Sequence, residues 1–295
     1  MQPVALDATY SIGEGLSGVG LYSREILLGL AGAHPTTTFD FWYRSHRYLR
    51  ARSEALPANV RRRLLAGPLG PRRARLFHGL NQRLPRILPA RSVATFHDLF
   101  VLTGDYSTPD FRARFAAQAR DAAHRATALI AVSDFTRRQI VSLLGVDPAR
   151  IAVVHHGIRR LDLPALPREN LVLNVGALQK RKNIVRLIEA FEALPPDWSL
   201  VLAGSDGFGA AEIHARIAAS PACTRISAPG YIAPAELAAA YARARIFAFP
   251  SLDEGFGMPV LEAMSAGVPV VTSRSSALPE VAGDAALLVD PADTA

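Results

Sequence analysis

Short apolar runs alternate with longer amphipathic stretches along the whole chain. The runs that predict strands are 4–6, 93–96, 128–132, 151–154, 171–175, 200–203, 224–226, 246–249, 268–272 and 287–289. The stretches that predict helices are 21–30, 111–126, 135–144, 184–194, 210–219, 234–244 and 259–266. Strands and helices that alternate in this way are typical of α/β proteins with parallel sheets. We therefore expect an α/β fold.

The periodicity breaks in residues 159–170, a segment that contains Pro164 and Pro167. Proline-bearing stretches without periodicity are typical of linkers. The strand–helix series then starts again, and 295 residues are enough for two domains of ordinary size. We expect two Rossmann-like domains that face each other, residues 1–165 and 166–295.

The composition excludes several classes of protein. With 49% hydrophobic residues the chain can bury a core, which excludes a disordered chain. The sequence has no apolar run long enough for a membrane-spanning helix and no leader of a basic region followed by an apolar one. The single cysteine, Cys223, excludes an internal disulfide framework and a cysteine-based zinc site. These features favour a cytoplasmic protein.

The net charge of +7 is distributed unevenly. Residues 1–160 hold 23 arginines, no lysine and 11 acidic residues, a net charge of +12, whereas residues 161–295 have a net charge of −5. A basic half is consistent with peripheral contact with an anionic membrane at its inner face, or with a solvated arginine-rich surface. Because no RNA- or DNA-binding motif accompanies the charge, we expect no nucleic-acid partner.

The most informative motif lies near the C-terminus. Glu254 and Glu262 are eight positions apart, with Gly255, Gly257 and Pro259 between them. We expect Glu254 in a loop and Glu262 near the first turn of a helix that Pro259 starts. A helix N-terminus is an anion site, so carboxylates beside it suit a ligand that offers both phosphate and hydroxyl groups. A nucleoside diphosphate sugar offers both.

Three cations, Lys180, Arg181 and Lys182, directly precede a predicted helix. A departing diphosphate needs positive charge as its bond to the sugar breaks, and Arg181 and Lys182 can supply it. A basic helix cap is the alternative. We expect Lys180 to be solvated.

Several segments occur together in an order that indicates a family. They are Ser17–Tyr22, Thr95–Leu99, Ala131–Thr136, Val175–Asn183, Leu202–Ser205, Gly230–Ile232, the Glu254–Glu262 motif and Leu278–Gly283. With them the chain resembles, over nearly its whole length, the retaining glycosyltransferases of family 4, which have the two-domain GT-B fold. The pattern is most similar to mannosyltransferase-like members that build bacterial surface polysaccharides. The Glu254–Glu262 motif is specific, whereas one glycine-rich loop alone is a weak signal.

The resemblance implies roles for the charged side chains. Glu254 is expected to bond hydroxyls of the donor sugar, and Glu262 those of the ribose. Lys182 is expected to stabilise the leaving diphosphate. Many members have an arginine where this chain has Ala177, and Arg181 is expected to supply the missing charge.

The resemblance also implies backbone contacts to the donor. These positions are Gly255, Phe256, Gly257, Met258 and Leu261 for the phosphate and sugar, Gly230, Tyr231 and Ile232 for the base, and Gly18 for the diphosphate. Glycine at such positions permits close approach of the ligand.

Two polar residues of the N-terminal half have two interpretations each. His97, beside Asp98 at a predicted strand end, is implied to act near the donor sugar, or is a structural histidine bonded to a loop carbonyl. Ser133 bonds phosphate or acceptor, or caps a helix. His155 and His156 replace a Pro-Asn pair common in the family, and their role stays open.

The implied activity is transfer of a hexosyl group, with mannosyl from GDP-mannose favoured, to a hydroxyl of a lipid-linked or polysaccharide acceptor with retention of configuration. No side chain stands out as a covalent nucleophile, which favours a front-face route. We expect no cofactor and no required metal, because the sequence has neither Asp-x-Asp nor a cluster with metal-ligand spacing.

Two other functions remain open. The resemblance implies further helices after residue 290, so we expect an incomplete C-terminal domain, and a non-catalytic nucleotide-sugar-binding remnant is the first alternative. A dinucleotide oxidoreductase is the second, and the Gly18–Gly20 loop indicates it only weakly because the full Gly-x-Gly-x-x-Gly pattern with a following acidic residue is missing.

Overall fold

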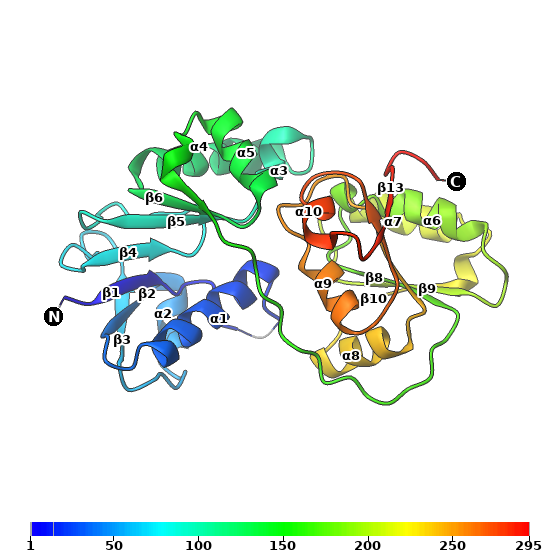
Figure 1. Cartoon of the computed structure of the whole chain (residues 1–295), viewed down its shortest axis with the longest axis horizontal. Helices are drawn as coiled ribbons and strands as arrows, with labels where there is room; N and C mark the ends of the chain where they lie inside the picture. The colour runs from blue at the N-terminus through cyan, green and yellow to red at the C-terminus, as the bar shows by residue number, and fades with distance from the viewer. Residues whose placement is uncertain (1, 14, 295) are drawn as a thin grey trace. The chain divides into compact units, whose positions relative to one another are not determined.

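The computed structural model describes residues 2–13 and 15–294. The chain divides into two compact units, each built on its own parallel sheet (Figure 1). The N-terminal unit extends to Leu102 and resumes at Asp110–His156. The C-terminal unit holds Thr103–Pro109 and the chain from Gly157 onward.

The N-terminal sheet has seven parallel strands in the order β3-β2-β1-β4-β5-β6-β7. The strands are β1 (Val4–Asp7), β2 (Phe39–Arg44), β3 (Val60–Leu65), β4 (Leu76–Gly79), β5 (Ser92–Phe96), β6 (Ala128–Ala131) and β7 (Ile151–Val153). The helices are α1 (Gly18–Ala33), α2 (Ser45–Ala51), α3 (Phe100–Thr103), α4 (Pro109–Arg125) and α5 (Asp134–Leu144). The strand order reverses between β1 and β4, as in a doubly wound fold.

Helices cover the N-terminal sheet through two apolar clusters. Leu27 of α1 and Ala51 of α2 pack with Phe41 of β2. Phe115 of α4 and Ile140 of α5 belong to a second cluster with β5 and β6. Figure 1 shows α1 and α2 beside β1–β3, and α4 and α5 beside β5 and β6. Within the described residues, no helix is both long and apolar enough to cross a membrane.

The C-terminal sheet has six parallel strands in the order β10-β9-β8-β11-β12-β13. The strands are β8 (Leu171–Val175), β9 (Ser199–Ala203), β10 (Ile226–Gly230), β11 (Ile246–Phe249), β12 (Val270–Ser273) and β13 (Leu287–Val289). The helices are α6 (Ile184–Glu192), α7 (Ala210–Ala218), α8 (Pro234–Arg243), α9 (Met258–Ser265) and α10 (Leu278–Ala282). This order also reverses once, between β8 and β11.

Both faces of the C-terminal sheet are covered. Ile188 of α6 and Ile213 of α7 pack with β9 on one face. Tyr241 of α8 and Val260 of α9 pack on the other face, against Phe247 of β11. A strand buried on both faces reads as a continuous apolar run, which explains why the runs 171–175 and 246–249 identify β8 and β11.

The predicted α/β class is confirmed, but several elements were not predicted. The missed elements are β2, β3, β4, α2, α3 and α10. β3 is an edge strand that carries Arg61–Arg63 in succession, so its sequence shows no alternation of apolar and polar residues. The strand predicted around 224–226 is present as β10, but it begins only at Ile226, because Cys223–Arg225 form a 3-10 turn.

Candidate donor site at the strand ends of the C-terminal unit

The predicted donor-site residues of the C-terminal unit cluster at the carboxyl ends of β8 and β11. The loop after β8 carries Arg181 and Lys182, and the loop after β11 carries Glu254. These two strands are neighbours at the point where the strand order reverses. In open α/β sheets ligands bind in the crevice at this point.

A buried cluster of three charges forms the centre of this site. Lys182 Nζ lies 2.5 Å from Glu254 Oε1, and Arg181 Nη1 lies 3.0 Å from the same oxygen. Lys182 and Glu254 are each only 7% exposed. The Lys182 Nζ also lies 4.5 Å from the centre of the Phe249 ring, at the end of β11. Two buried cations thus share one carboxylate oxygen.

The cations determine the ionisation of Glu254. Burial raises the pKa of this carboxyl group, but the charges and hydrogen bonds of Arg181 and Lys182 outweigh burial and lower the pKa to about 2. Glu254 is therefore an anion at neutral pH. As an anion it can accept hydrogen bonds from hydroxyl groups.

The local backbone brings these loops together. Arg181 and Lys182 lie in a 3-10 turn that ends at Asn183, whose φ of 58° is in the left-handed region. Asn183 Nδ2 donates to the Pro250 carbonyl at 3.2 Å, and Leu252 N donates to the Arg181 carbonyl at 2.8 Å. Asparagine tolerates this conformation better than most residues, so it can turn the chain directly from the cations into α6.

The N-terminus of α9 lies next in the chain after Glu254. Its cap, Gly257, has a φ of 102°, and a Cβ there would lie 2.7 Å from Leu278 Cδ2. Only glycine fits this position without strain. Pro259 lies in the first turn, and Glu262 is the fifth residue of α9, so it lies at the start of the second turn rather than in the first. The N–H groups of a first helical turn point toward the space before the helix.

Glu262 has a partner that was not predicted. Tyr241 of α8 donates its hydroxyl hydrogen to Glu262 Oε2 at 3.0 Å. The pKa of Glu262 is raised, because the effect of burial exceeds that of the hydrogen bond from Tyr241, which lowers it. Tyr241 is fully buried, and the apolar pattern of 234–244 could only indicate that it belongs to the core.

Asp253 is a second residue that sequence reasoning missed. Its side chain is 7% exposed, and Oδ2 accepts from Thr103 Oγ1 at 2.6 Å within the C-terminal unit. Burial raises the pKa of Asp253, against the effect of that hydrogen bond. Its backbone carbonyl accepts from Arg181 Nη1 at 2.8 Å. Asp253 therefore helps to fix Arg181 beside Glu254.

The segment expected to hold the base starts at the end of β10. Gly230 is the last residue of that strand and has a φ of 78°. Its carbonyl accepts from Gly204 N at 2.9 Å. Tyr231 is 57% exposed, whereas Ile232 packs against the core. Tyr231 follows the carboxyl end of β10, which lies at the same edge of the parallel sheet as the charge cluster.

His97 lies at the end of β5 in the N-terminal unit, among aromatic side chains. Its Nε2 forms a hydrogen bond with the Leu80 carbonyl at 2.8 Å. This is the contact expected if His97 is a structural histidine bonded to a loop carbonyl. The ring centre lies 4.7 Å from that of Tyr22 and 5.4 Å from that of His156. Burial lowers the pKa of His97 to about 4 and that of His156 to about 3, so both rings are neutral at pH 7. A catalytic role for His97 stays a prediction.

Ser133 and Gly18 both lie at helix N-termini of the N-terminal unit. Ser133 Oγ accepts from Thr136 N at 3.0 Å and caps α5, as in the capping alternative. Gly18 is the first residue of α1, after the cap Ser17, so it lies within a helix rather than in the expected loop. A Cβ at Gly20 would lie 2.9 Å from the Tyr10 carbonyl, which explains a glycine inside the first turn.

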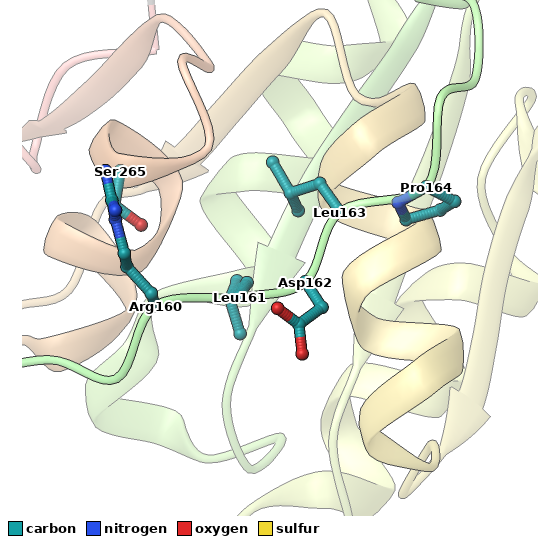
Figure 2. Close-up of a pocket in the computed structure, with 6 residues that line it drawn as sticks. All are labelled: Arg160, Leu161, Asp162, Leu163, Pro164 and Ser265. Atoms are coloured by element: carbon teal, nitrogen blue, oxygen red, sulfur yellow. The ribbon is translucent and has the colours of Figure 1, made fainter.

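A cavity lies away from these strand ends. It has a volume of about 620 Å³ and is lined by Arg160, Leu161, Asp162, Leu163, Pro164 and Ser265. Figure 2 shows the linker segment passing beside Ser265, the last residue of α9. Since α9 rises about 12 Å over its eight residues, this cavity lies at the opposite end of the helix from Gly257. Over residues 2–13 and 15–294, no group of three or more His, Cys, Asp or Glu residues could hold a metal ion.

Two protein families match consecutive parts of the chain. "Glycosyltransferase Family 4" matches residues 74–160, and "Glycosyl transferases group 1" matches residues 161–295. O-antigen chain mannosyltransferase B of Escherichia coli is 32% identical over 236 residues, which are 74% of this chain and 62% of that protein. The serotype-specific mannosyltransferase WbdA of Escherichia coli is 29% identical over 70% of this chain and 28% of its own length. The chain thus spans less than two thirds of these relatives.

Solved structures share the fold over the whole chain. Sucrose-phosphate synthase from Thermosynechococcus elongatus matches with a TM-score of 0.79 and 22% identity, covering 100% of this chain and 87% of its own. HepE of Anabaena, crystallised with UDP and glucose, matches with a TM-score of 0.72 and 20% identity, with the same coverage. These likenesses confirm the predicted fold class, two Rossmann-like domains of the GT-B type.

Proposed function

The chain belongs to the family 4 glycosyltransferases, and on that premise we propose that it moves a hexosyl group from a nucleoside diphosphate sugar to an acceptor hydroxyl. The favoured donor is GDP-mannose, and the acceptor is a glycan or a lipid-linked glycan. Retention of the anomeric configuration is part of the proposal. The two mannosyltransferases among the relatives support the choice of sugar.

One observation carries the proposal, namely the buried cluster of Arg181, Lys182 and Glu254 beside the N-terminus of α9. Its two cations and the helix dipole suit a diphosphate. Its carboxylate and that of Glu262 suit sugar and ribose hydroxyls, which donate hydrogen bonds. A ligand that has phosphates between two sets of hydroxyl groups matches the cations, the helix N-terminus and the two carboxylates.

The reaction needs the bond between the anomeric carbon and the β-phosphate oxygen to break. Its electron pair stays on that oxygen, where Lys182 and Arg181 stabilise the developing charge. The acceptor oxygen bonds to the same face of the anomeric carbon, and its proton passes to the departing phosphate oxygen. No covalent enzyme intermediate is required. Glu254 accepts the sugar hydroxyls and holds the sugar in place for this step.

We expect this chemistry to need neither a cofactor nor a divalent metal. Lys182, Arg181 and the N-terminus of α9 supply the positive charge that a metal ion supplies in other transferases. Transfer that continues unchanged in EDTA would agree with this expectation. Loss of transfer in EDTA and its return with Mg²⁺ would contradict it.

The direct test is a transfer assay with GDP-mannose and an acceptor glycan, followed by NMR of the product's anomeric proton. A product with the donor's configuration supports the proposal, and an inverted product contradicts the retaining mechanism. Binding of GDP-mannose without any turnover would instead support the non-catalytic remnant. NAD-dependent hydride transfer would support the oxidoreductase.

On the acceptor side, we propose that the arginine-rich N-terminal unit contacts an anionic membrane surface. The short helix α2 exposes Leu49 by 75%, with Arg47 and Arg50 on either side. An exposed apolar residue between cations suits the interface of an anionic bilayer. Co-sedimentation with phosphatidylglycerol vesicles but not with phosphatidylcholine vesicles is expected. Leu49→Glu should weaken it, and equal binding to both vesicles would contradict the proposal.

A further inference from the structure

We propose that Tyr241 is a positioning residue that fixes the Glu262 carboxylate for the ribose hydroxyls of the nucleotide. The chain would then prefer ribonucleotides to nucleotides that lack the 2′- and 3′-hydroxyls. The inference rests on the proposed function, which assigns the ribose to Glu262.

The first support is the geometry of the pair. The Tyr241 hydroxyl lies 3.0 Å from Glu262 Oε2, and the tyrosine ring is fully buried against Phe247, with ring centres 5.8 Å apart. A buried ring packed in this way has little freedom to rotate. The hydrogen bond therefore fixes one oxygen of a side chain that would otherwise sample several rotamers.

The second support is the number of hydrogen bonds that Glu262 can still accept. A phenol donates a single hydrogen, and the Tyr241 hydroxyl lies 3.0 Å from Glu262 Oε2 but 3.5 Å from the Pro259 carbonyl. On the shorter bond, Tyr241 occupies one lone pair of Oε2. The other lone pair of Oε2 and both lone pairs of Oε1 can accept hydrogens from a vicinal diol. The tyrosine therefore orients the carboxylate and leaves its other lone pairs able to accept hydrogen bonds from the ligand.

The third support is the frame that holds the two helices. Arg168 of the linker donates to the Tyr241 carbonyl at 2.6 Å and the Ala244 carbonyl at 2.8 Å, at the end of α8. It also donates to the Ala266 carbonyl at 2.7 Å, at the end of α9. These bonds use backbone oxygens only. Removing the tyrosine hydroxyl leaves them in place, so Tyr241→Phe tests the hydroxyl alone.

The experiment is calorimetric titration of the wild type and Tyr241→Phe with GDP and with 2′,3′-dideoxy-GDP, and with the matching uridine pair. For whichever base binds, Tyr241→Phe should weaken the ribonucleotide about tenfold, because a hydrogen bond to a charged group is lost. The dideoxynucleotide should bind the two proteins equally. Tyr43→Phe, which changes a buried tyrosine of the N-terminal unit, is the matched control and should change neither affinity.

Equal weakening of both nucleotides by Tyr241→Phe would mean a general structural role and would overturn the inference. Unchanged affinity for the ribonucleotide would overturn it as well, while leaving the proposed function standing. A wild type that binds no nucleoside diphosphate would overturn both. Glu262→Gln gives a second measurement that does not need the tyrosine variant to fold. It should abolish the preference for the ribonucleotide, and an undiminished preference would contradict the inference.

Discussion

The C-terminal sheet and the first six strands of the N-terminal sheet follow one order, β10-β9-β8-β11-β12-β13 and β3-β2-β1-β4-β5-β6, yet their strand ends hold opposite kinds of chemistry. Beside the end of β5 the N-terminal unit gathers neutral rings, Tyr22, His97 and His156, while the ends of β1 and β2 carry the Asp7–Arg44 ion pair. The C-terminal unit gathers ionised groups, among them Lys182 and Glu254. A shared scaffold with different loops is thus sufficient for an uncharged site and a charged one.

The net charge of each half of the chain does not describe the groups at its site. Residues 1–160 have a net charge of +12, but burial keeps His97 and His156 uncharged. Residues 161–295 have a net charge of −5, but two buried cations, Arg181 and Lys182, meet at the Glu254 carboxylate. Overall charge therefore describes the surfaces, whereas burial and pairing decide the charge of the sites. Under the proposed function, the site with two cations suits the diphosphate and the neutral one an uncharged hydroxyl.

The largest effect is expected from removing a cation of the charged site. Lys182→Ala should lower the rate of transfer by about 10²–10³-fold, because a charge that stabilises the leaving phosphate is lost. Lys180→Ala, at the exposed position of the same turn, is the control and should keep the wild-type rate. Similar rates in both variants, measured by release of free nucleoside diphosphate, would contradict the role of Lys182.

Removing the anion of the same cluster should affect stability. Glu254→Gln removes the carboxylate charge that Lys182 and Arg181 share, which should cost about 3 kcal/mol of unfolding free energy at pH 7. The pKa of Glu254 falls from its ordinary 4.5 to about 2 in the folded chain. Its contribution is therefore complete above pH 4.5 and is lost as the pH falls toward 2. Urea unfolding, followed by the fluorescence of Trp198 in a Trp42→Phe background, measures the difference in unfolding free energy between Glu254 and Glu254→Gln. A difference that does not change with pH would contradict this assignment of the Glu254 charge.

The neutral site should respond to acid in a higher pH range. His97 has a pKa of about 4 in the folded chain against an ordinary 6.5, so the unfolded chain takes up the proton first. The contribution of His97 is constant above pH 6.5 and falls by about 3 kcal/mol as the pH drops toward 4. The fluorescence of Trp42 in a Trp198→Phe background reports the unfolding of the N-terminal unit at each pH. His97→Asn, which does not titrate, should make the profile less steep, and the remaining pH dependence should come from His78 and His156, whose pKa values burial lowers to about 4 and about 3. A profile as steep as that of the wild type would contradict the burial of a neutral His97 ring.

The smallest effect separates capping from ligand binding at Ser133. Ser133→Ala removes the cap of α5 and should cost about 1 kcal/mol of unfolding free energy. If Ser133 only caps the helix, affinity for the nucleoside diphosphate stays the same. A large loss of affinity in calorimetric titration would instead support the phosphate contact that the resemblance implies. Ser142→Ala, near the other end of α5, is the control.

The sequence was most informative where both faces of a strand are buried or where a motif is continuous. The runs at β8 and β11 and the segment from Glu254 to Glu262 predicted their elements, because local sequence determines them. The partners of the site residues were not predictable, since Tyr241 and Glu262 meet only through the packing of α8 on α9. Likewise, His156 reaches His97 from another strand end. β3 was missed because an edge strand rich in arginine has no apolar pattern.

The most direct test is thermal unfolding of the chain in EDTA with GDP, UDP, ADP or NAD. In the two single-tryptophan variants, the fluorescence of Trp198 follows the C-terminal unit and that of Trp42 follows the N-terminal unit. The account predicts that one nucleoside diphosphate stabilises the unit reported by Trp198, by about 2.7 kcal/mol at a hundredfold excess over Kd. It also predicts that Glu262→Gln reduces this stabilisation. Stabilisation by NAD alone, or by none of the four nucleotides, would contradict a nucleotide-sugar site at the strand ends of the C-terminal unit.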